Sequence, residues 1–254
     1  MQIVKDLRGP DGCPWDKEQT HESLAPFAIE EVYELIESIE RNDTEHFKEE
    51  LGDVLFQVAL HCQLAEELNE FSYRDVLQTL CEKLVRRHPH VFSDVKVKDI
   101  NEVWSNWEKI KKQEKESKNK QNQPIKTFDF PAALPALQRA HKIGVKSEKL
   151  KFDWQHPDDV FNKVLEELNE LKVEVEQNSA KEKIQEEFGD LLFSLAQWAR
   201  HLNLEAEQTL RKANSKFENR FNKMMSLVSK KKLDWNLLSD SEKESLWQEI
   251  KNIN

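Results

Sequence analysis

The chain has 254 residues and a formal net charge of −10; 34% of its residues are charged, and only 5 are Gly and 8 are Pro. This length allows one large or two modest domains, and the scarcity of turn-forming residues favours an all-α fold over a sheet. The negative charge leaves no general basic field for a nucleic acid polymer, although a metal ion and a few local cations would still permit binding of a small polyphosphate.

The N-terminal stretch MQIVKDLRGPDGCPWDKEQ (1–19) lacks the apolar core of a signal peptide. No apolar run in the sequence approaches the length that spans a membrane. The three cysteines, Cys13, Cys62 and Cys81, form no C-x-x-C pair, so neither a disulfide framework nor a zinc site is indicated. We therefore expect a cytoplasmic protein with no membrane partner.

Helix breaks divide the sequence in chain order. They fall at GPDGCP (9–14), RND (41–43), HPHVFSD (88–94), QNSA (177–180) and KKKLDW (230–235), which predicts four or five helices in each half. The stretch KKQEKESKNKQNQPIK (111–126) is polar and has no aromatic residue, as in an exposed linker or the frayed end of a helix. We predict helical domains at 1–112 and 128–254, joined by a polar linker at 113–127.

The two halves repeat one another. EEVYELIESIE (30–40) aligns with EELNELKVEVE (166–176), and the E-E-x-G-D segments at 49–53 and 186–190 align at nearly the same offset. Further on, EKLVRRHPHVF (82–92) aligns with SKFENRFNKMM (215–225), and NWEKIKK (106–112) with LWQEIKN (246–252). Ordered correspondence over four segments indicates two tandem helical bundles of one design.

Each half carries two acidic pairs with i,i+3 spacing, which places both acids of a pair on one side of a helix. The pairs are Glu31 with Glu34, Glu50 with Asp53, Glu167 with Glu170, and Glu187 with Asp190. The residues at −3, +1 and +4 from the first acid of every pair are apolar. Each pair is therefore expected beside the stripe that faces the other helices of its bundle.

Clustered carboxylates in a partly dry site repel one another unless cations compensate their charge. Hard oxygen ligands without His or Cys favour Mg²⁺, or Mn²⁺ as a substitute, and so favour phosphate-ester chemistry. With 48 Asp and Glu in the chain, a single E-x-x-E is more often a solvated helix face, but the duplication favours a metal site. A ferritin-like di-iron site would require Glu-x-x-His pairs on core helices, and here that spacing occurs only at Glu18 and His21.

An E-x-x-E pair followed about fifteen residues later by E-x-x-D within a G-D-x-L-F context resembles the all-α nucleoside triphosphate pyrophosphohydrolases, in particular the two-copy MazG family. Supporting phrases are GCPWDKEQTHESLAPFAIEE, ELGDVLFQVALH, RRHPHVF, LPALQRAHKI, FDW and EEFGDLLF. The resemblance implies an all-helical enzyme, usually a homodimer, that uses Mg²⁺ to convert nucleoside triphosphates to monophosphates and pyrophosphate.

The resemblance also implies roles for individual residues. The eight acids of the four pairs would bind metal. Phosphate contacts would come from Lys216 and Arg220, or Lys83 and Arg87 in the first half, and the nucleotide would lie against Trp247 or Trp107. Glu166 and Glu186, each adjacent to a predicted ligand, are candidates for the base that takes a proton from the attacking water.

Two further classes of function are weighed against the enzyme. A nucleotide-sensing or partner-binding protein would bind Mg²⁺ and nucleotide without turnover, and a helical scaffold would bind neither. Both halves retain the acids, the basic pair and a tryptophan. By analogy with related two-copy proteins, we expect the second half to carry the activity.

Overall fold

A computed structural model describes residues 1–118 and 127–252. These residues form helices and connecting segments without any β-strand, which confirms the predicted all-α class. No helix among them is sufficiently long and apolar to cross a bilayer. The chain divides into two compact units, Met1–Gln123 and Pro124–Asn254, which we call unit 1 and unit 2.

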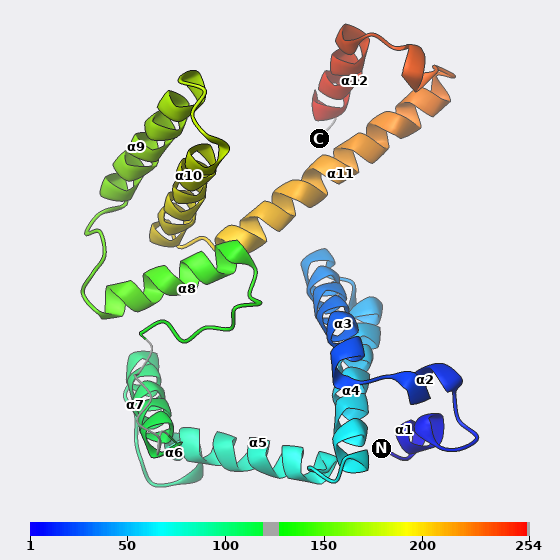
Figure 1. Cartoon of the computed structure of the whole chain (residues 1–254), viewed down its shortest axis with the longest axis vertical. Helices are drawn as coiled ribbons and strands as arrows, with labels where there is room; N and C mark the ends of the chain where they lie inside the picture. Colours follow the sequence, from blue (N-terminus) through cyan, green and yellow to red (C-terminus); the bar gives the residue numbers. More distant parts are fainter. Residues whose placement is uncertain (119–126, 253–254) are drawn as a thin grey trace. The chain divides into compact units, whose positions relative to one another are not determined.

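Unit 1 is built around two long antiparallel helices, α3 and α4, which lie along each other (Figure 1). Its small core joins α1, α3 and α4 through Val4, Leu24, Leu60 and Leu64. The helices of unit 1 are α1 (Gln2–Arg8), α2 (Pro14–Glu18), α3 (His21–Arg41), α4 (Thr44–Glu67), α5 (Tyr73–Arg87), α6 (Pro89–Phe92) and α7 (Ile100–Lys118).

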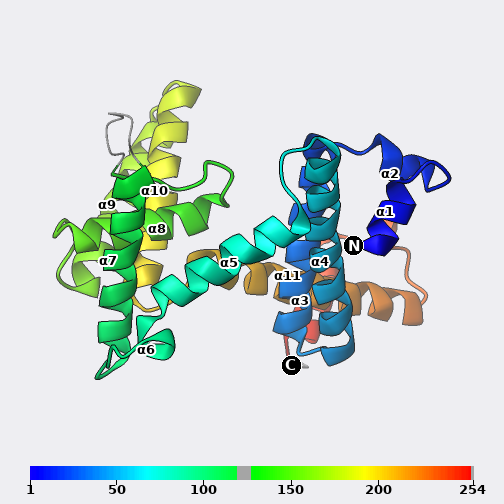
Figure 2. The same cartoon turned by 90° about the horizontal axis from the view of Figure 1, so that it is seen from below.

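Unit 2 repeats the paired helices as α9 and α10, which run side by side in both views (Figures 1 and 2). A separate core between α11 and α12 contains Met224, Val228, Leu246 and Ile250. The helices of unit 2 are α8 (Ala136–Lys149), α9 (Pro157–Glu176), α10 (Lys181–His201), α11 (Ala206–Lys230), the short 3₁₀ helix η1 (Trp235–Leu237) and α12 (Asp240–Asn252).

Local capping residues fix where the paired helices begin and end. The Thr20 side chain accepts a hydrogen bond from the backbone N–H of Ser23 at the start of α3, and Asp43 accepts one from His46 at the start of α4, both at 3.2 Å. Between these helices Asn42 adopts a left-handed conformation with φ 56°, which Asn tolerates better than most residues. The chain thus reverses within two residues, so α3 and α4 are antiparallel.

The predicted helix breaks all coincide with helix ends, but the helix count needs correction for unit 1. The described part of unit 1 has seven α-helices instead of four or five, because the N-terminal segment forms the two short helices α1 and α2 and the HPHVF stretch forms the short helix α6. Pro14 starts α2 and Pro89 starts α6, at a position where the missing N–H of proline costs nothing. Helix α7 also continues to Lys118, so 113–118 of the predicted linker is helical, and 119–126 lies outside the described residues.

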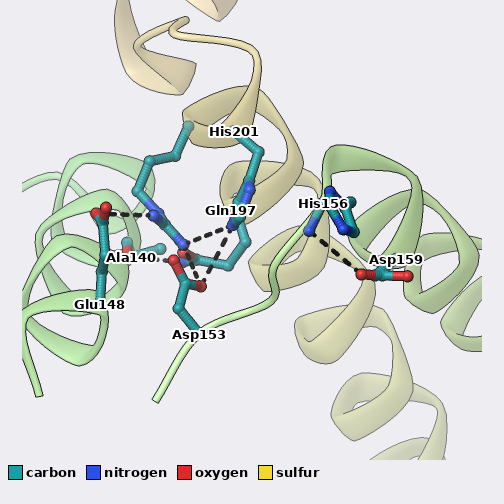
Figure 3. A network of polar contacts seen from close by, with 8 residues as sticks. Ala140, Glu148, Asp153, His156, Asp159, Gln197 and His201 are labelled. Atoms are coloured by element: carbon teal, nitrogen blue, oxygen red, sulfur yellow. Dashed lines mark hydrogen bonds and ion pairs between the residues drawn. The ribbon is translucent and has the colours of Figure 1, made fainter. Parts of the chain in front are cut away.

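A buried polar network joins α8, α10 and the segment that leads into α9 (Figure 3). Arg200 of α10 donates to Asp153 at 2.6 Å and to Gln197 at 3.0 Å, and Gln197 donates to the carbonyl of Ala140 at 2.8 Å. The side chains of Arg200 and Asp153 are only 7% and 11% exposed. This network holds the start of α9 against α10 and thereby sets the relative position of the two helices.

The apolar stripe beside the acids is only partly covered. Val164 is buried, as predicted, but the residue that follows the first acid of each pair is 42–52% exposed; these residues are Val32, Leu51, Leu168 and Phe188. The expectation that the whole stripe faces other helices of its own bundle is therefore wrong. Two paired helices form a single layer, and in the described residues its second face remains open.

Candidate metal and nucleotide site

The paired helices bring three carboxylates together in each unit. In unit 1 these are Glu31 from α3 with Glu50 and Asp53 from α4, and one oxygen from each lies within 4.8 Å of the others. In unit 2, Glu167 from α9 and Glu187 and Asp190 from α10 satisfy the same criterion. We call these sets triad 1 and triad 2.

The fourth predicted acid of each unit lies outside its triad. Glu34 and Glu170 are exposed and follow Glu31 and Glu167 by three residues, which is almost one helical turn. They remain close enough that their charges help raise the pKa of triad carboxylates, Glu34 for Glu31 and Glu50, and Glu170 for Glu187. The structure thus gathers six of the eight predicted ligands into triads and places two beside them.

Triad 1 is partly desolvated, and few neighbouring groups compensate the charge of its three carboxylates. Burial, followed by the nearby Asp53 carboxylate, raises the pKa of Glu31, and burial is also the main reason that the pKa of Glu50 is raised. His46 lies 3.2 Å from one oxygen of Glu50, and Gln57 donates a hydrogen bond to Glu31 at 3.4 Å. The second oxygen of Glu50 is buried and has no hydrogen-bond partner among the described residues.

Triad 2 has a different partner. Lys163, one turn before Glu167 on α9, contacts Glu167 at 2.8 Å and Glu166 at 2.7 Å. These hydrogen bonds raise the pKa of Lys163 well above its usual range. Across the pair of helices, burial and the charge of Glu170 raise the pKa of Glu187. One ammonium group therefore neutralises only part of this acidic site.

The donor set of both triads fits a hard divalent cation. Each triad offers only carboxylate oxygens from two helices, the type of ligand that Mg²⁺ and Mn²⁺ prefer. Glu50 has a buried oxygen without a partner, which a cation would satisfy. The raised pKa values of Glu31, Glu50 and Glu187 reflect repulsion and burial that a bound cation would relieve.

The predicted phosphate and base contacts lie on other helices. In unit 1, Lys83 and Arg87 are on α5 and Trp107 is on α7, with the Arg87 guanidinium 5.6 Å from the Trp107 ring centre. Arg87 is also bound to Glu114 of α7, whose carboxylate is 2.5 Å from a guanidinium nitrogen.

In unit 2, Lys216 and Arg220 are on α11, and Trp247 of α12 packs against Phe217 with ring centres 5.2 Å apart. Trp247 thus adjoins the helix that carries the basic pair. In the described part of the chain, neither Lys216 nor Arg220 forms an ion pair with triad 2. In unit 2 the predicted metal ligands are therefore on α9 and α10, whereas the predicted phosphate and base contacts are on α11 and α12.

The candidate bases have different surroundings. Glu166 is 56% exposed and is held by Lys163, whereas Glu186 is exposed and its charge helps raise the pKa of the adjacent Glu187. Both remain predictions. Sequence reasoning did not identify Lys163, although its i,i+4 spacing from Glu167 was a usable signal. It also missed Gln57 and Glu114, which no local spacing connects to the residues that they contact.

Comparison with known proteins places this arrangement in a family. The family model described as the MazG nucleotide pyrophosphohydrolase domain matches residues 19–92 and 155–225, which include the two triads. The chain is 44% identical over 251 residues to the nucleoside triphosphate pyrophosphohydrolase/pyrophosphatase MazG of Thermotoga maritima, covering 99% of this chain and 94% of that protein.

It is also 41% identical over 253 residues to the nucleoside triphosphate pyrophosphohydrolase of Escherichia coli K12, covering 99% of this chain and 95% of that protein. A crystal structure of a mazG-related protein from Thermotoga maritima is similar over 44% of this chain and 95% of its own, with 28% identity and a TM-score of 0.38. The resemblance of the sequence motifs is therefore confirmed, and the chain belongs to the MazG nucleotide pyrophosphohydrolase family, whose domain it carries twice.

Proposed function

We propose that the protein hydrolyses nucleoside triphosphates to monophosphates and pyrophosphate with Mg²⁺, for which Mn²⁺ can substitute. The observation that carries this proposal is the duplicated triad, which occurs in both segments that match the family. The enzyme class is supported by the relatives from Thermotoga maritima and Escherichia coli, which are named as nucleoside triphosphate pyrophosphohydrolases. The metal is supported by the all-carboxylate donor set and by the unpartnered oxygen of Glu50.

The chain's own residues would divide the work between binding and proton transfer. Bound Mg²⁺ would neutralise negative charge on the triphosphate and on the leaving pyrophosphate. Glu167, Glu187 and Asp190 would hold it in unit 2, with Glu170 beside them. Glu166 or Glu186 would accept a proton from the attacking water.

Lys216 and Arg220 would bind phosphate oxygens, since their i,i+4 spacing puts both cations on one side of α11. Trp247 would stack on the base. A tryptophan face stacks on any base, so we propose a broad base range and a role in nucleotide-pool house-cleaning or regulation. A cytoplasmic location completes the proposal and is in keeping with three free cysteines.

We further propose that the protein acts as a homodimer. Leu165, Leu168, Phe188 and Leu192 are 44–52% exposed on the α9–α10 layer, a density of large apolar side chains that is typical of an interface. A two-fold interface would pair this layer with its own copy and convert two helices into a four-helix bundle.

The test is pyrophosphate release from several nucleoside triphosphates with Mg²⁺, measured for the native chain, Glu167→Ala and Glu31→Ala. Loss of one ligand of the charge-neutralising metal is expected to lower turnover about 100-fold or more. The matched control is Glu176→Ala, which removes an exposed acid at the end of the same helix α9. It should retain native turnover.

If only Glu167→Ala loses turnover, unit 2 carries the activity. If the native chain binds Mg²⁺ and nucleotide but forms no monophosphate, the sensing or partner-binding alternative replaces the proposal. A chain that shows no binding of Mg²⁺ with a nonhydrolysable analogue would be a helical scaffold.

A further inference from the structure

A carboxylate occupies the arginine cluster at the junction of α5 and α7 in unit 1. Arg87 donates two hydrogen bonds to Oε2 of Glu114, one from Nε at 3.1 Å and one from a terminal guanidinium nitrogen at 2.5 Å. Arg86 donates to the other oxygen of Glu114 at 2.7 Å. Both oxygens of one carboxylate are therefore bound by two guanidinium groups.

This contact is strong for its position near the surface. The side chains of Glu114 and Arg87 are only 15% and 19% exposed, so water screens their charges incompletely. The hydrogen bond from Arg87, reinforced by Arg86, lowers the pKa of Glu114 to about 2. Glu114 is thus an anion at any physiological pH and presents oxygens to Arg87 as a phosphate group would.

The equivalent position in unit 2 differs. Arg220 aligns with Arg87, but Asn219 stands where unit 1 has Arg86. Counting from the aligned tryptophans, Glu114 corresponds to Asn254, whose side chain is an uncharged amide and which lies outside the described residues. Among the residues that the structure describes, Arg220 has no carboxylate partner comparable to Glu114.

We propose that Glu114 is an internal anion that competes with nucleotide phosphates for Arg87, so that unit 1 is the weaker nucleotide site. This inference rests on the proposed function. It gives a physical cause for the expectation that unit 2 carries the activity, although both units have the same acids, basic pair and tryptophan. Binding of a triphosphate at Arg87 would have to displace Glu114 from Arg87. One oxygen of this partly buried carboxylate would then lose its partner, while Arg86 would still hold the other.

The competing explanation is that Glu114 only ties α7 to α5. The two explanations predict different responses to two substitutions. If Glu114 only links the two helices, the contact between α5 and α7 is weakened both by Glu114→Gln and by Arg86→Gln, since each removes a charged contact. Competition is relieved only by Glu114→Gln, because Arg86→Gln leaves the anion on Arg87.

The experiment uses the full chain carrying Lys216→Ala and Arg220→Ala, which removes both predicted phosphate contacts of unit 2 so that nucleotide binding reports on unit 1. Calorimetry measures the affinity for Mg²⁺ with α,β-methylene ATP. Glu114→Gln is expected to bind at least ten-fold more tightly than its parent. The matched control is Glu116→Gln, which makes the same change of charge at an exposed position of α7 and should bind as the parent does.

Adding Arg87→Ala to the Glu114→Gln chain should abolish the gain in nucleotide affinity. Equal affinities for Glu114→Gln and Glu116→Gln, within two-fold, would overturn the inference, and so would equal gains for Glu114→Gln and Arg86→Gln. If Glu114→Gln fails to fold, Glu114→Asp keeps the charge but withdraws it by one methylene, and should give a smaller gain. Pyrophosphate release by the native chain separates the two claims: if it occurs and Glu114→Gln gives no gain, only this inference fails.

Discussion

Gly144 is the glycine whose replacement the structure predicts to be most damaging to unit 2. It is buried in the middle of α8, where an added Cβ would overlap Gln197 Oε1 and lie 2.5 Å from Arg200 Nε. Gln197 cannot swing aside into solvent, because it is 1% exposed and donates to the carbonyl of Ala140. Gly144→Ala should therefore break contacts of the network that holds Asp153.

The size of the effect follows from the contacts that are lost. The bond from Gln197 to Ala140 contributes about 1 kcal/mol, and disturbing the charged bonds of Arg200 costs about 1.5–3 kcal/mol. Ala gains about 1 kcal/mol over Gly in a helix interior, and forcing extra volume into a packed site costs about 1–3 kcal/mol. We expect Gly144→Ala to lower the free energy of unfolding of unit 2 by about 2.5–6 kcal/mol.

Urea unfolding followed by circular dichroism measures this change. Gly189→Ala is the matched control, since Gly189 is also in the middle of a helix of unit 2 but an added Cβ meets no atom within 4 Å. The control should leave stability unchanged or raise it by up to about 1 kcal/mol. A Gly144→Ala chain as stable as this control would refute the account of the network.

Three further predictions concern the interface, the pH response and the metal. Phe188→Glu places a charge on the exposed α9–α10 layer and should weaken dimerisation about 100-fold, measured by analytical ultracentrifugation; an unchanged dimer would exclude this layer as the interface. The Nδ1 atoms of His21 and His61 are 2.8 Å apart. Burial, together with the charge of His21, lowers the pKa of His61 below its usual 6.5, so protonation of His61 favours the unfolded chain. The free energy of unfolding should therefore be highest above pH 6.5 and fall as the pH decreases below it, and less so in His61→Phe, as pH-dependent urea titrations would show. Adding Mg²⁺ at about 100 times its dissociation constant should stabilise the native chain by about 2.7 kcal/mol, with EDTA reversing the effect and a Glu50→Gln/Glu187→Gln chain showing none.

Local periodicity explains why much of the fold and of the triads could be predicted. Helix ends followed from residues such as Asn42 and Pro89, which act within one turn. The i,i+3 spacing of Glu50 and Asp53 fixes both on one side of α4 whatever α4 packs against. The two-fold repeat then extended the same interpretation to Glu187 and Asp190.

Interactions between distant segments explain what was not predicted. Whether the first or second acid of a pair enters a triad depends on how two helices cross, so Asp53 belongs to triad 1 while Glu34 does not. Glu114 and Arg87 are 27 residues apart, and only the packing of α7 on α5 brings them together. The open face with Leu168 was unpredictable because apolar periodicity indicates burial without naming the partner.

The most direct test of the account is a crystal grown with Mn²⁺ and α,β-methylene ATP, examined by anomalous diffraction. We predict an anomalous peak within coordinating distance of Glu167, Glu187 and Asp190, with the triphosphate bound to the same ion. Carboxylates turned to solvent with no ion between them, in either triad, would contradict the central claim that these acids are clustered to hold a divalent metal.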